Sequence, residues 1–209
     1  DGHYYDKDSG ALVTNKFVEE YGRTYYVDEN GNKAIGSKEI NGAWNYFDKH
    51  GELITNNFAP DGRYYDKYGK QVDFGRNRYF ELNGEWYYAG NDGAILKGPQ
   101  TIDGVKVYFH QNGMQAKGYF VKDEEDNKSR YYDKDTGALA TNQYVIAYNP
   151  YKHRIERYYV NDQGIRLTGP QTIDGKQVYF DTYEGSQVFD NFADDGYFYD
   201  QDGNRVNLG

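Results

Sequence analysis

The chain has 209 residues, a formal net charge of −9 and no cysteine. The acidic balance disfavours nucleic acid and anionic membranes as partners, because both attract clustered lysine and arginine. The absence of cysteine excludes a disulfide framework and thiol chemistry. Only 37% of the residues are hydrophobic and 18% are aromatic. We therefore expect the apolar surface to be buried ring against ring in many small clusters.

Pairs of adjacent aromatic residues recur along the whole chain, in steps of about twenty residues, which is typical of a repeat architecture. In chain order the pairs are Tyr4-Tyr5, Tyr25-Tyr26, Tyr46-Phe47, Tyr64-Tyr65, Tyr87-Tyr88, Tyr108-Phe109, Tyr131-Tyr132, Tyr158-Tyr159, Tyr179-Phe180 and Phe198-Tyr199. A glycine that we assign to a turn follows each pair. Each unit is too short for a helix with strands, so the pattern indicates β-hairpins.

These observations predict an all-β fold, an elongated β-solenoid of about ten stacked β-hairpin repeats of roughly 20 residues each. Adjacent residues of a strand point to opposite faces, so one ring of each pair should face the core and the other outward. No proline- or serine-rich linker interrupts the pattern. We expect residues 1–209 to form a single monomeric repeat domain, and we interpret it as a fragment of a longer chain.

Residues 98–118 contain one complete copy of the unit. We expect a turn at Asp103-Gly104 before an aromatic strand at 107–109, and a second turn at Asn112-Gly113 before a polar strand. Asp-Gly and Asn-Gly are strong hairpin signals, because both residues of a type I′ turn need positive φ. The opening motif Gly-Pro-Gln-Thr-Ile-Asp-Gly returns letter for letter at 169–175.

No residue pattern indicates catalysis, a metal site or a cofactor site. Most carboxylates stand beside glycine or asparagine in turns, where their side chains hydrogen-bond the backbone. The four histidines, His3, His50, His110 and His153, occupy unrelated repeat positions, whereas metal or nucleophile sites need several converging groups. We predict that the chain is not an enzyme and has no catalytic, metal-binding or cofactor-binding residue.

Sugar binding is the better interpretation of the exposed polar and aromatic positions. A tyrosine ring suits the C–H face of a sugar, while amides and ammonium groups bind its hydroxyl rim. Gln115 and Lys117 are two residues apart, so they should leave one face of a strand together. Tyr108 lies on the paired strand, and Thr101 and Gln100 come from the preceding link. Alternatively, the tyrosines only pack and the polar groups are merely solvated.

Three stretches, 101–118, 130–142 and 171–181, carry a resemblance that extends over essentially the whole chain. They resemble the C-terminal glucan-binding domain, often called domain V, of bacterial glucansucrases such as dextransucrase. The Gly-Pro-Gln-Thr-Ile-Asp-Gly element is the most specific part. The broader Tyr-Tyr-x-x-x-x-Gly theme is shared with choline-binding and clostridial-toxin repeats.

The resemblance implies a non-catalytic module that binds α-glucan, chiefly dextran and isomaltooligosaccharides, outside the cell or at its surface. The parent enzyme would polymerise glucose from sucrose. The implied pockets consist of a tyrosine, a glutamine and a lysine, which match Tyr108, Gln115 and Lys117. The second copy offers Tyr179, Gln187 and Thr172, but its lysine position holds Phe189.

Two other functions stay open at this point. A choline-binding module needs cages of electron-rich rings, best built with tryptophan, and this chain has only Trp44 and Trp86. A structural or protein-binding solenoid would need no sugar site at all.

Overall fold

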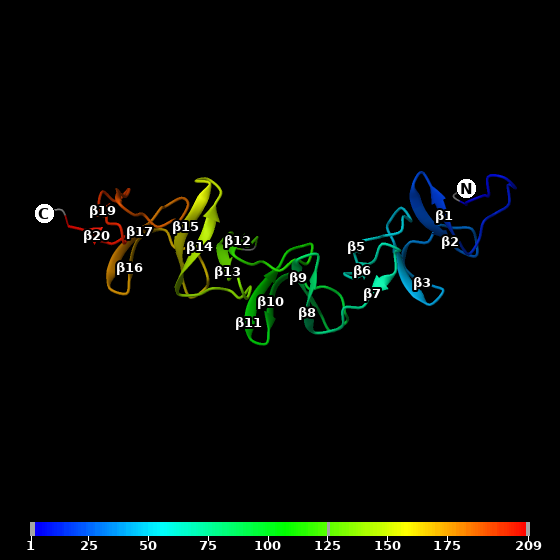
Figure 1. Ribbon diagram of the computed structural model, residues 1–209, viewed down its shortest axis with the longest axis horizontal. Coiled ribbons are helices and arrows are strands. Elements are labelled where there is room, and N and C mark those ends of the chain that lie inside the picture. Colours follow the sequence, from blue (N-terminus) through cyan, green and yellow to red (C-terminus); the bar gives the residue numbers. More distant parts are fainter. Residues whose placement is uncertain (1–2, 125, 208–209) are drawn as a thin grey trace. The chain divides into compact units, whose positions relative to one another are not determined.

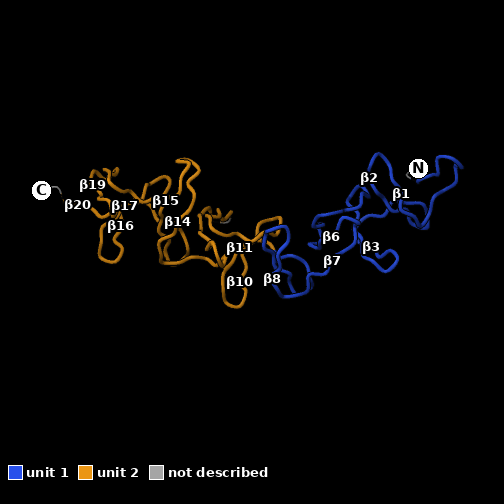
Figure 2. The backbone as a smooth tube through the Cα atoms, in the orientation of Figure 1, with its two compact units in different colours: residues 1–96 blue, residues 97–209 orange. Residues whose placement is uncertain are grey.

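The computed structural model describes residues 3–124 and 126–207 (Figure 1). The chain divides into two compact units, residues 1–96 and 97–209 (Figure 2). Twenty strands pair into nine antiparallel sheets within the described residues, and each sheet joins strands that are consecutive in the sequence. This arrangement confirms the predicted all-β fold of hairpin repeats. The described part contains no helix that could cross a membrane.

Unit 1 contains four of the sheets. They are β1 (Lys16–Glu20) with β2 (Arg23–Val27), β3 (Gly36–Ile40) with β4 (Ala43–Phe47), β5 (Asn57–Phe58) with β6 (Tyr64–Tyr65) and β7 (Gln71–Val72), and β8 (Arg78–Leu82) with β9 (Glu85–Ala89).

Unit 2 contains the other five sheets. They are β10 (Gly98–Ile102) with β11 (Val105–Phe109), β12 (Tyr119–Lys122) with β13 (Ser129–Tyr132), β14 (Gln143–Asn149) with β15 (Arg154–Val160), β16 (Gly169–Ile173) with β17 (Lys176–Phe180), and β18 (Asn191–Phe192) with β19 (Phe198–Tyr199) and β20 (Arg205–Val206).

Two-residue turns close the hairpins whose strands are five residues long. In β10–β11, Asp103 and Gly104 have φ angles of 50° and 81°, as a type I′ turn requires. The predicted turn is therefore confirmed. The same backbone recurs at Asn41-Gly42 and Asp174-Gly175. It suits these sequences, because glycine, asparagine and aspartate tolerate positive φ and the turn matches the twist of the strands.

The turn at Asn112-Gly113 has a different form from the one predicted. Only Gly113 has positive φ, and its N–H donates to the carbonyl of His110 at 2.8 Å. The N–H of His110 in turn donates to the carbonyl of Met114 at 2.8 Å. This is a longer loop in which one glycine takes the left-handed position. The polar strand expected after it is reduced to a single bridge between Phe109 and Gln115.

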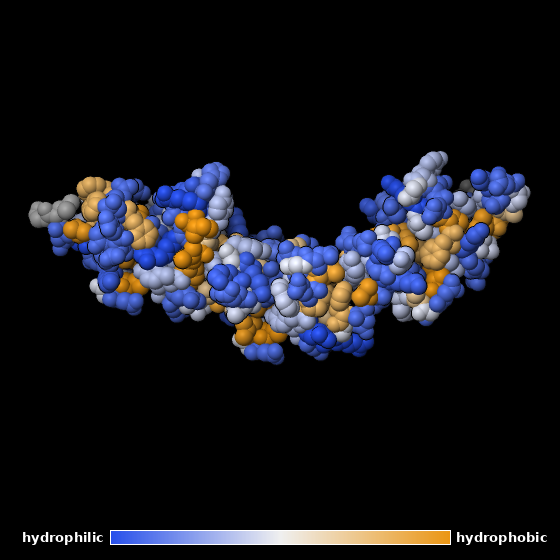
Figure 3. Space-filling model, viewed as in Figure 1, coloured by the Kyte–Doolittle hydropathy of each residue, from blue (hydrophilic) through white to orange (hydrophobic). Residues whose placement is uncertain are grey.

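Small clusters make up the hydrophobic core, as the aromatic composition predicts. On hairpin β3–β4, the fully buried Phe47 packs with Tyr26, Ala34 and Ile40. The ring of Phe17 meets that of Tyr26 edge to face, with 5.1 Å between centroids. On the face shown in Figure 3, apolar residues accordingly form separate patches among hydrophilic ones.

The expectation that one ring of each aromatic pair faces outward is wrong for several pairs. Tyr131 and Tyr132 are both buried, as are Tyr179 and Phe180. The rings still point to opposite faces, but both faces are covered. Tyr131 enters a cluster with Val145, whereas Tyr132 enters another. A tyrosine in this repeat thus packs against a neighbouring unit on either side of its own hairpin.

Three hairpins form a distinct class that recurs at every third unit. Hairpins β3–β4, β10–β11 and β16–β17 each begin at a glycine with positive φ and end at a fully buried phenylalanine. We call them the Gly-start hairpins. The unit that follows each one carries a tyrosine at an equivalent position, and these are Tyr65, Tyr132 and Tyr199, at intervals of 67 residues.

Candidate functional site

A groove of about 550 Å³ lies between hairpin β10–β11 and the segments that follow it, and we call it the β10 groove. Two residues predicted to bind sugar, Gln100 and Thr101, line it. Its complete lining is Pro99, Gln100, Thr101, Lys106, Val107, Asp123, Arg130, Tyr132, Leu139, Asp162 and Gln163.

The strand register determines the hairpin side of the groove. Thr101 lies directly opposite Lys106, so both exposed side chains leave the same face of the hairpin. The side-chain amide of Gln100 donates to the carbonyl of Lys97 at 2.7 Å, which holds this amide in place. The hairpin thus presents a hydroxyl, an ammonium and an amide, a set that both donates and accepts hydrogen bonds.

Arg130 on β13 supplies the facing side of the groove. Its Nη1 donates to a carboxylate oxygen of Asp123 at 3.1 Å and to one of Asp126 at 3.0 Å, and its Nη2 bonds the second oxygen of Asp126. A guanidinium between two carboxylates is fixed in its orientation. The hydrogen bond from Arg130 lowers the pKa of Asp126 to about 2.

This ion pair gives a pH prediction. The pKa of Asp126 is depressed, so the pair stabilises the fold above the ordinary value of 3.8 and is lost as the pH falls towards 2. Carboxyl-carbon NMR should show Asp126 titrating near 2 in the native chain and moving back towards 3.8 in Arg130→Gln. Because the pair lies at the surface, its effect on global stability should be small. An unchanged midpoint in Arg130→Gln would show that the guanidinium is not the cause.

Tyr132 forms the floor of the β10 groove. It is buried on Ala116 and Val121, and burial raises its pKa to about 12, so the phenol stays neutral. Its strand-bridge partner Leu139 also lines the groove. The arrangement offers directed hydrogen-bonding groups around a neutral floor. Among the described residues, no group of three or more acidic, histidine or cysteine side chains is placed to hold a metal ion.

Each of the other two Gly-start hairpins borders an equivalent groove. The β16 groove, of about 210 Å³, is lined by Pro170, Gln171, Thr172, Gln177, Val178, Tyr199 and Arg205. The β3 groove, of about 520 Å³, is lined by Ser37, Trp44, Asp61, Arg63, Gln71, Val72, Asp73, Arg76, Asp92 and Gly93. The predicted residue Thr172 thus occupies the place of Thr101. Gln171 repeats the bond of Gln100, donating to the carbonyl of Thr168 at 2.9 Å.

The predicted residues Gln115 and Lys117 lie outside the β10 groove. Gln115 is buried, and its amide donates to the carbonyl of Thr136 at 3.3 Å. The Nζ of Lys117 donates to the carbonyl of Asp135 at 3.0 Å. Both side chains share a face, as predicted, but that face holds the next turn of the chain rather than an open pocket.

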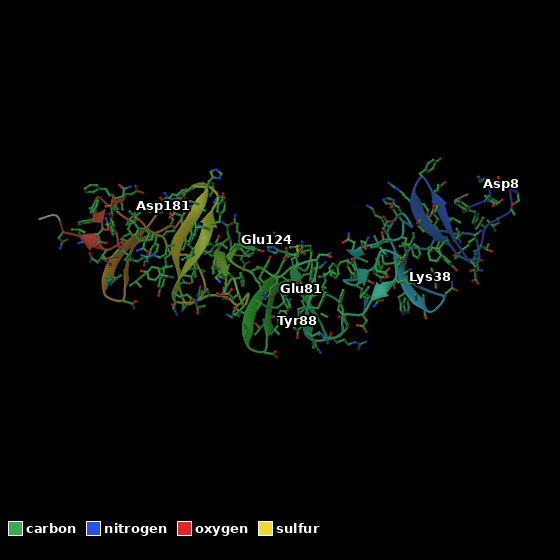
Figure 4. The ribbon with its side chains drawn as sticks, viewed as in Figure 1. Asp8, Lys38, Glu81, Tyr88, Glu124 and Asp181 are labelled. Carbon is green, nitrogen blue, oxygen red and sulfur yellow. The ribbon has the colours of Figure 1, made fainter. Side chains whose placement is uncertain are left out.

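Tyr108 lies on the other face of its strand. Gln115 bridges Phe109, and Tyr108 is the neighbour of Phe109, so strand alternation separates the tyrosine from Gln115 and Lys117. Tyr108 instead borders a second cavity of about 790 Å³. Glu124 lines that cavity too and belongs to the loop between β12 and β13 (Figure 4). The structure does not bring the three predicted pocket residues together.

The second predicted pair is also packed into the fold. Tyr179 is buried, with its ring 5.7 Å from that of Tyr199. Gln187 is buried as well, and its Oε1 accepts a 2.8 Å hydrogen bond from Nε of Arg157. Its Nε2 donates to the carbonyl of Gly203 at 3.5 Å. Gln187 and Gln115 therefore hold equivalent structural positions.

Comparison with known proteins shows that the chain is similar to a segment of streptococcal glucosyltransferases. Glucosyltransferase-S of Streptococcus mutans serotype c is 37% identical over 173 residues, which are 80% of this chain and 11% of that protein. Glucosyltransferase-I of Streptococcus downei is 32% identical over 192 residues, which are 89% of this chain and 11% of that protein. The chain is a homologue of this glucosyltransferase segment. The resemblance to glucansucrase repeats is confirmed, and the chain spans about a tenth of these relatives' length.

Residues 96–144 of this chain match the choline-binding repeat family. A solved structure of choline binding protein F from Streptococcus pneumoniae, determined with a tetrasaccharide-pentapeptide analogue of peptidoglycan, is 25% identical. It covers 98% of this chain and 75% of that protein, with a TM-score of 0.50. This likeness supports the β-hairpin repeat fold.

Most residues that line the β10 groove of this chain are not predicted from the sequence. Lys106 comes from hairpin β10–β11, whereas Arg130 and Tyr132 come from β12–β13, so no single repeat contains the site. The strand pairing of the unit that follows each Gly-start hairpin does locate one lining residue. In each groove, one lining residue is the strand partner of the equivalent tyrosine, and these partners are Gln71, Leu139 and Arg205.

Proposed function

We propose that this chain is a non-catalytic α-glucan-binding region of an extracellular, sucrose-dependent glucosyltransferase. One observation carries the proposal: glucosyltransferases match 80% or more of this chain with only 11% of their own length. The chain thus corresponds to a part of such an enzyme, and the rest of the relative is available for catalysis. Binding the polymer would keep the enzyme on its product at the cell surface.

The grooves have suitable chemistry for a neutral sugar. Each glucose residue presents hydroxyl groups that donate and accept, and the β10 groove meets them with Gln100, Thr101, Lys106 and the fixed guanidinium of Arg130. The β16 groove repeats the amide and the hydroxyl. Several shallow sites on one chain can engage one long polymer, which raises the apparent affinity without any new contact.

Choline binding is the second candidate, because residues 96–144 match the choline-binding repeat family. A quaternary ammonium is recognised by a cage of exposed aromatic rings. The β10 groove lies within the matched stretch for most of its lining, yet its single aromatic residue, Tyr132, is only 5% exposed. This groove therefore suits hydroxyl groups better than a choline headgroup.

Affinity electrophoresis tests the proposal. We expect gels that contain dextran to retard the chain, and long dextran to bind about 10²–10⁴ times more tightly than isomaltotriose because the sites are linked. Retardation should change little with salt, since the ligand is uncharged. A choline resin should let the chain pass. Retention on choline without retardation by dextran would identify a choline-binding module, and loss of both would indicate a structural solenoid.

A further inference from the structure

The β3 groove differs from its two equivalents at one strand position. The residue opposite the fourth residue of the first strand is Lys106 in the β10 groove and Gln177 in the β16 groove, but Trp44 in the β3 groove. Trp44 is 47% exposed and lines its groove. Of the three grooves, this one alone presents an accessible aromatic ring among its described lining residues.

The backbone explains why Trp44 stays at the surface. Its strand neighbour Asn45 is buried and donates its side-chain amide to the carbonyl of Gly69. Phe47 is fully buried on the same face as Asn45. Strand alternation then directs Trp44 to the opposite face, over the groove. A large indole surface is left in contact with water, and burying such a ring against a ligand is favourable.

Polar groups with fixed positions surround the indole. Nη2 of Arg63 donates to the carbonyl of Asp92 at 3.2 Å, and Asp61 accepts a 2.9 Å hydrogen bond from the hydroxyl of Tyr65. Gln71 is the strand partner of Tyr65 and also lines the groove. The groove therefore combines an aromatic platform with a guanidinium that donates, a carboxylate that accepts and an amide that does both.

This combination selects a ligand class. A quaternary ammonium needs several rings around it, whereas the β3 groove has one ring and side chains of both charges. A hexose has an apolar C–H face for one ring and a rim of hydroxyls for mixed donors and acceptors. Resting on the proposed α-glucan-binding function, we propose that the β3 groove is the principal sugar subsite of this chain, with a glucose residue stacked on Trp44 and its rim bound by Gln71 and Arg63.

The chain offers a matched control for this proposal. It has two tryptophans. Trp86 occupies the equivalent hairpin position, opposite Glu81 as Trp44 is opposite Glu39, and it is 38% exposed. Trp86 lines none of the three grooves described above. The two residues thus share strand position and similar exposure but differ in their surroundings.

Fluorescence of single-tryptophan variants gives the test. In Trp86→Phe, Trp44 is the single tryptophan, and isomaltotriose should shift the tryptophan emission and protect it from acrylamide quenching. In Trp44→Phe, the same titration should leave the emission of Trp86 unchanged. Trp44→Ala should weaken isomaltotriose binding about tenfold, as loss of a stacked ring predicts, and Trp86→Ala should bind like the native chain. Circular dichroism confirms that each variant keeps its fold.

The outcomes separate this inference from the proposed function. If native chain is retarded by dextran but the sugar perturbs Trp86 rather than Trp44, or perturbs neither, the β3 subsite is wrong and glucan binding stands. If choline perturbs Trp44 and isomaltotriose does not, the ligand class is wrong. If dextran does not retard the native chain, the proposed function itself fails, because that assay does not depend on any one groove.

Discussion

Replacing Phe47 with alanine is expected to lower the free energy of unfolding by about 3–5 kcal/mol. Phe47 is fully buried in the cluster with Tyr26, Ala34 and Ile40, and its ring also lies 6.4 Å from that of Phe17. The clusters in this fold are small, so few neighbours are available to fill the cavity that the lost ring would leave. Urea unfolding followed by circular dichroism measures the change.

The control for Phe47→Ala is Ile35→Ala, since Ile35 lies in the same unit and is 67% exposed. That change should alter the free energy of unfolding by no more than about 0.5 kcal/mol. Equal effects of the two substitutions would contradict a core built from local aromatic clusters. The hairpin that Phe47 closes also carries Trp44, so we expect Phe47→Ala to weaken sugar binding along with stability.

Gln115→Ala is expected to destabilise the chain by about 1–3 kcal/mol, because a buried side chain and its hydrogen bond to the carbonyl of Thr136 are lost together. The Gln115 amide also packs directly on Gly137, where no side chain would fit beside it. Lys117→Ala serves as the control. Lys117 bonds the neighbouring carbonyl of Asp135 from a partly exposed position, and its loss should cost no more than about 0.5 kcal/mol.

The same pair of variants discriminates between two sites. If Gln115→Ala leaves stability unchanged and abolishes binding of isomaltotriose, then the pocket predicted on Tyr108, Gln115 and Lys117 is correct and the grooves beside the Gly-start hairpins are not the sites. If Gln115→Ala destabilises the chain and Lys117→Ala retains binding, the two residues serve the stacking of units. Thermal unfolding and isothermal titration on both variants give the answer.

The hairpin repeats could be predicted from the sequence because their determinants are local. Asp103-Gly104 adopts the turn that its residue types favour, and the aromatic pair beside it forms a strand. The form of the turn at Asn112-Gly113 is harder to predict, since the same residue types also fit a longer loop. Its true form decides that Gln115 lies opposite Phe109, and that register places Tyr108 on the other face.

The candidate site could be predicted only in part. Gln100 and Thr101 were identified because their motif is repeated, and both line the β10 groove. Arg130 and Lys106 were not, because they meet only after two units have stacked. No local sequence pattern predicts which faces of successive hairpin units pack together. Burial of both Tyr131 and Tyr132 has the same origin, since each face of their strand is covered by a different neighbour.

The return of the Gly-start hairpins at every third unit has a consequence for how such a chain can change in length. Adding or removing a single hairpin would place a unit of the wrong class after the insertion point, so a groove would lose one of its two walls. Adding or removing 67 residues, the interval between Tyr65, Tyr132 and Tyr199, keeps every unit beside the class of neighbour it has now. Three hairpins, rather than one, are therefore the smallest segment that can be duplicated or deleted with the binding grooves intact.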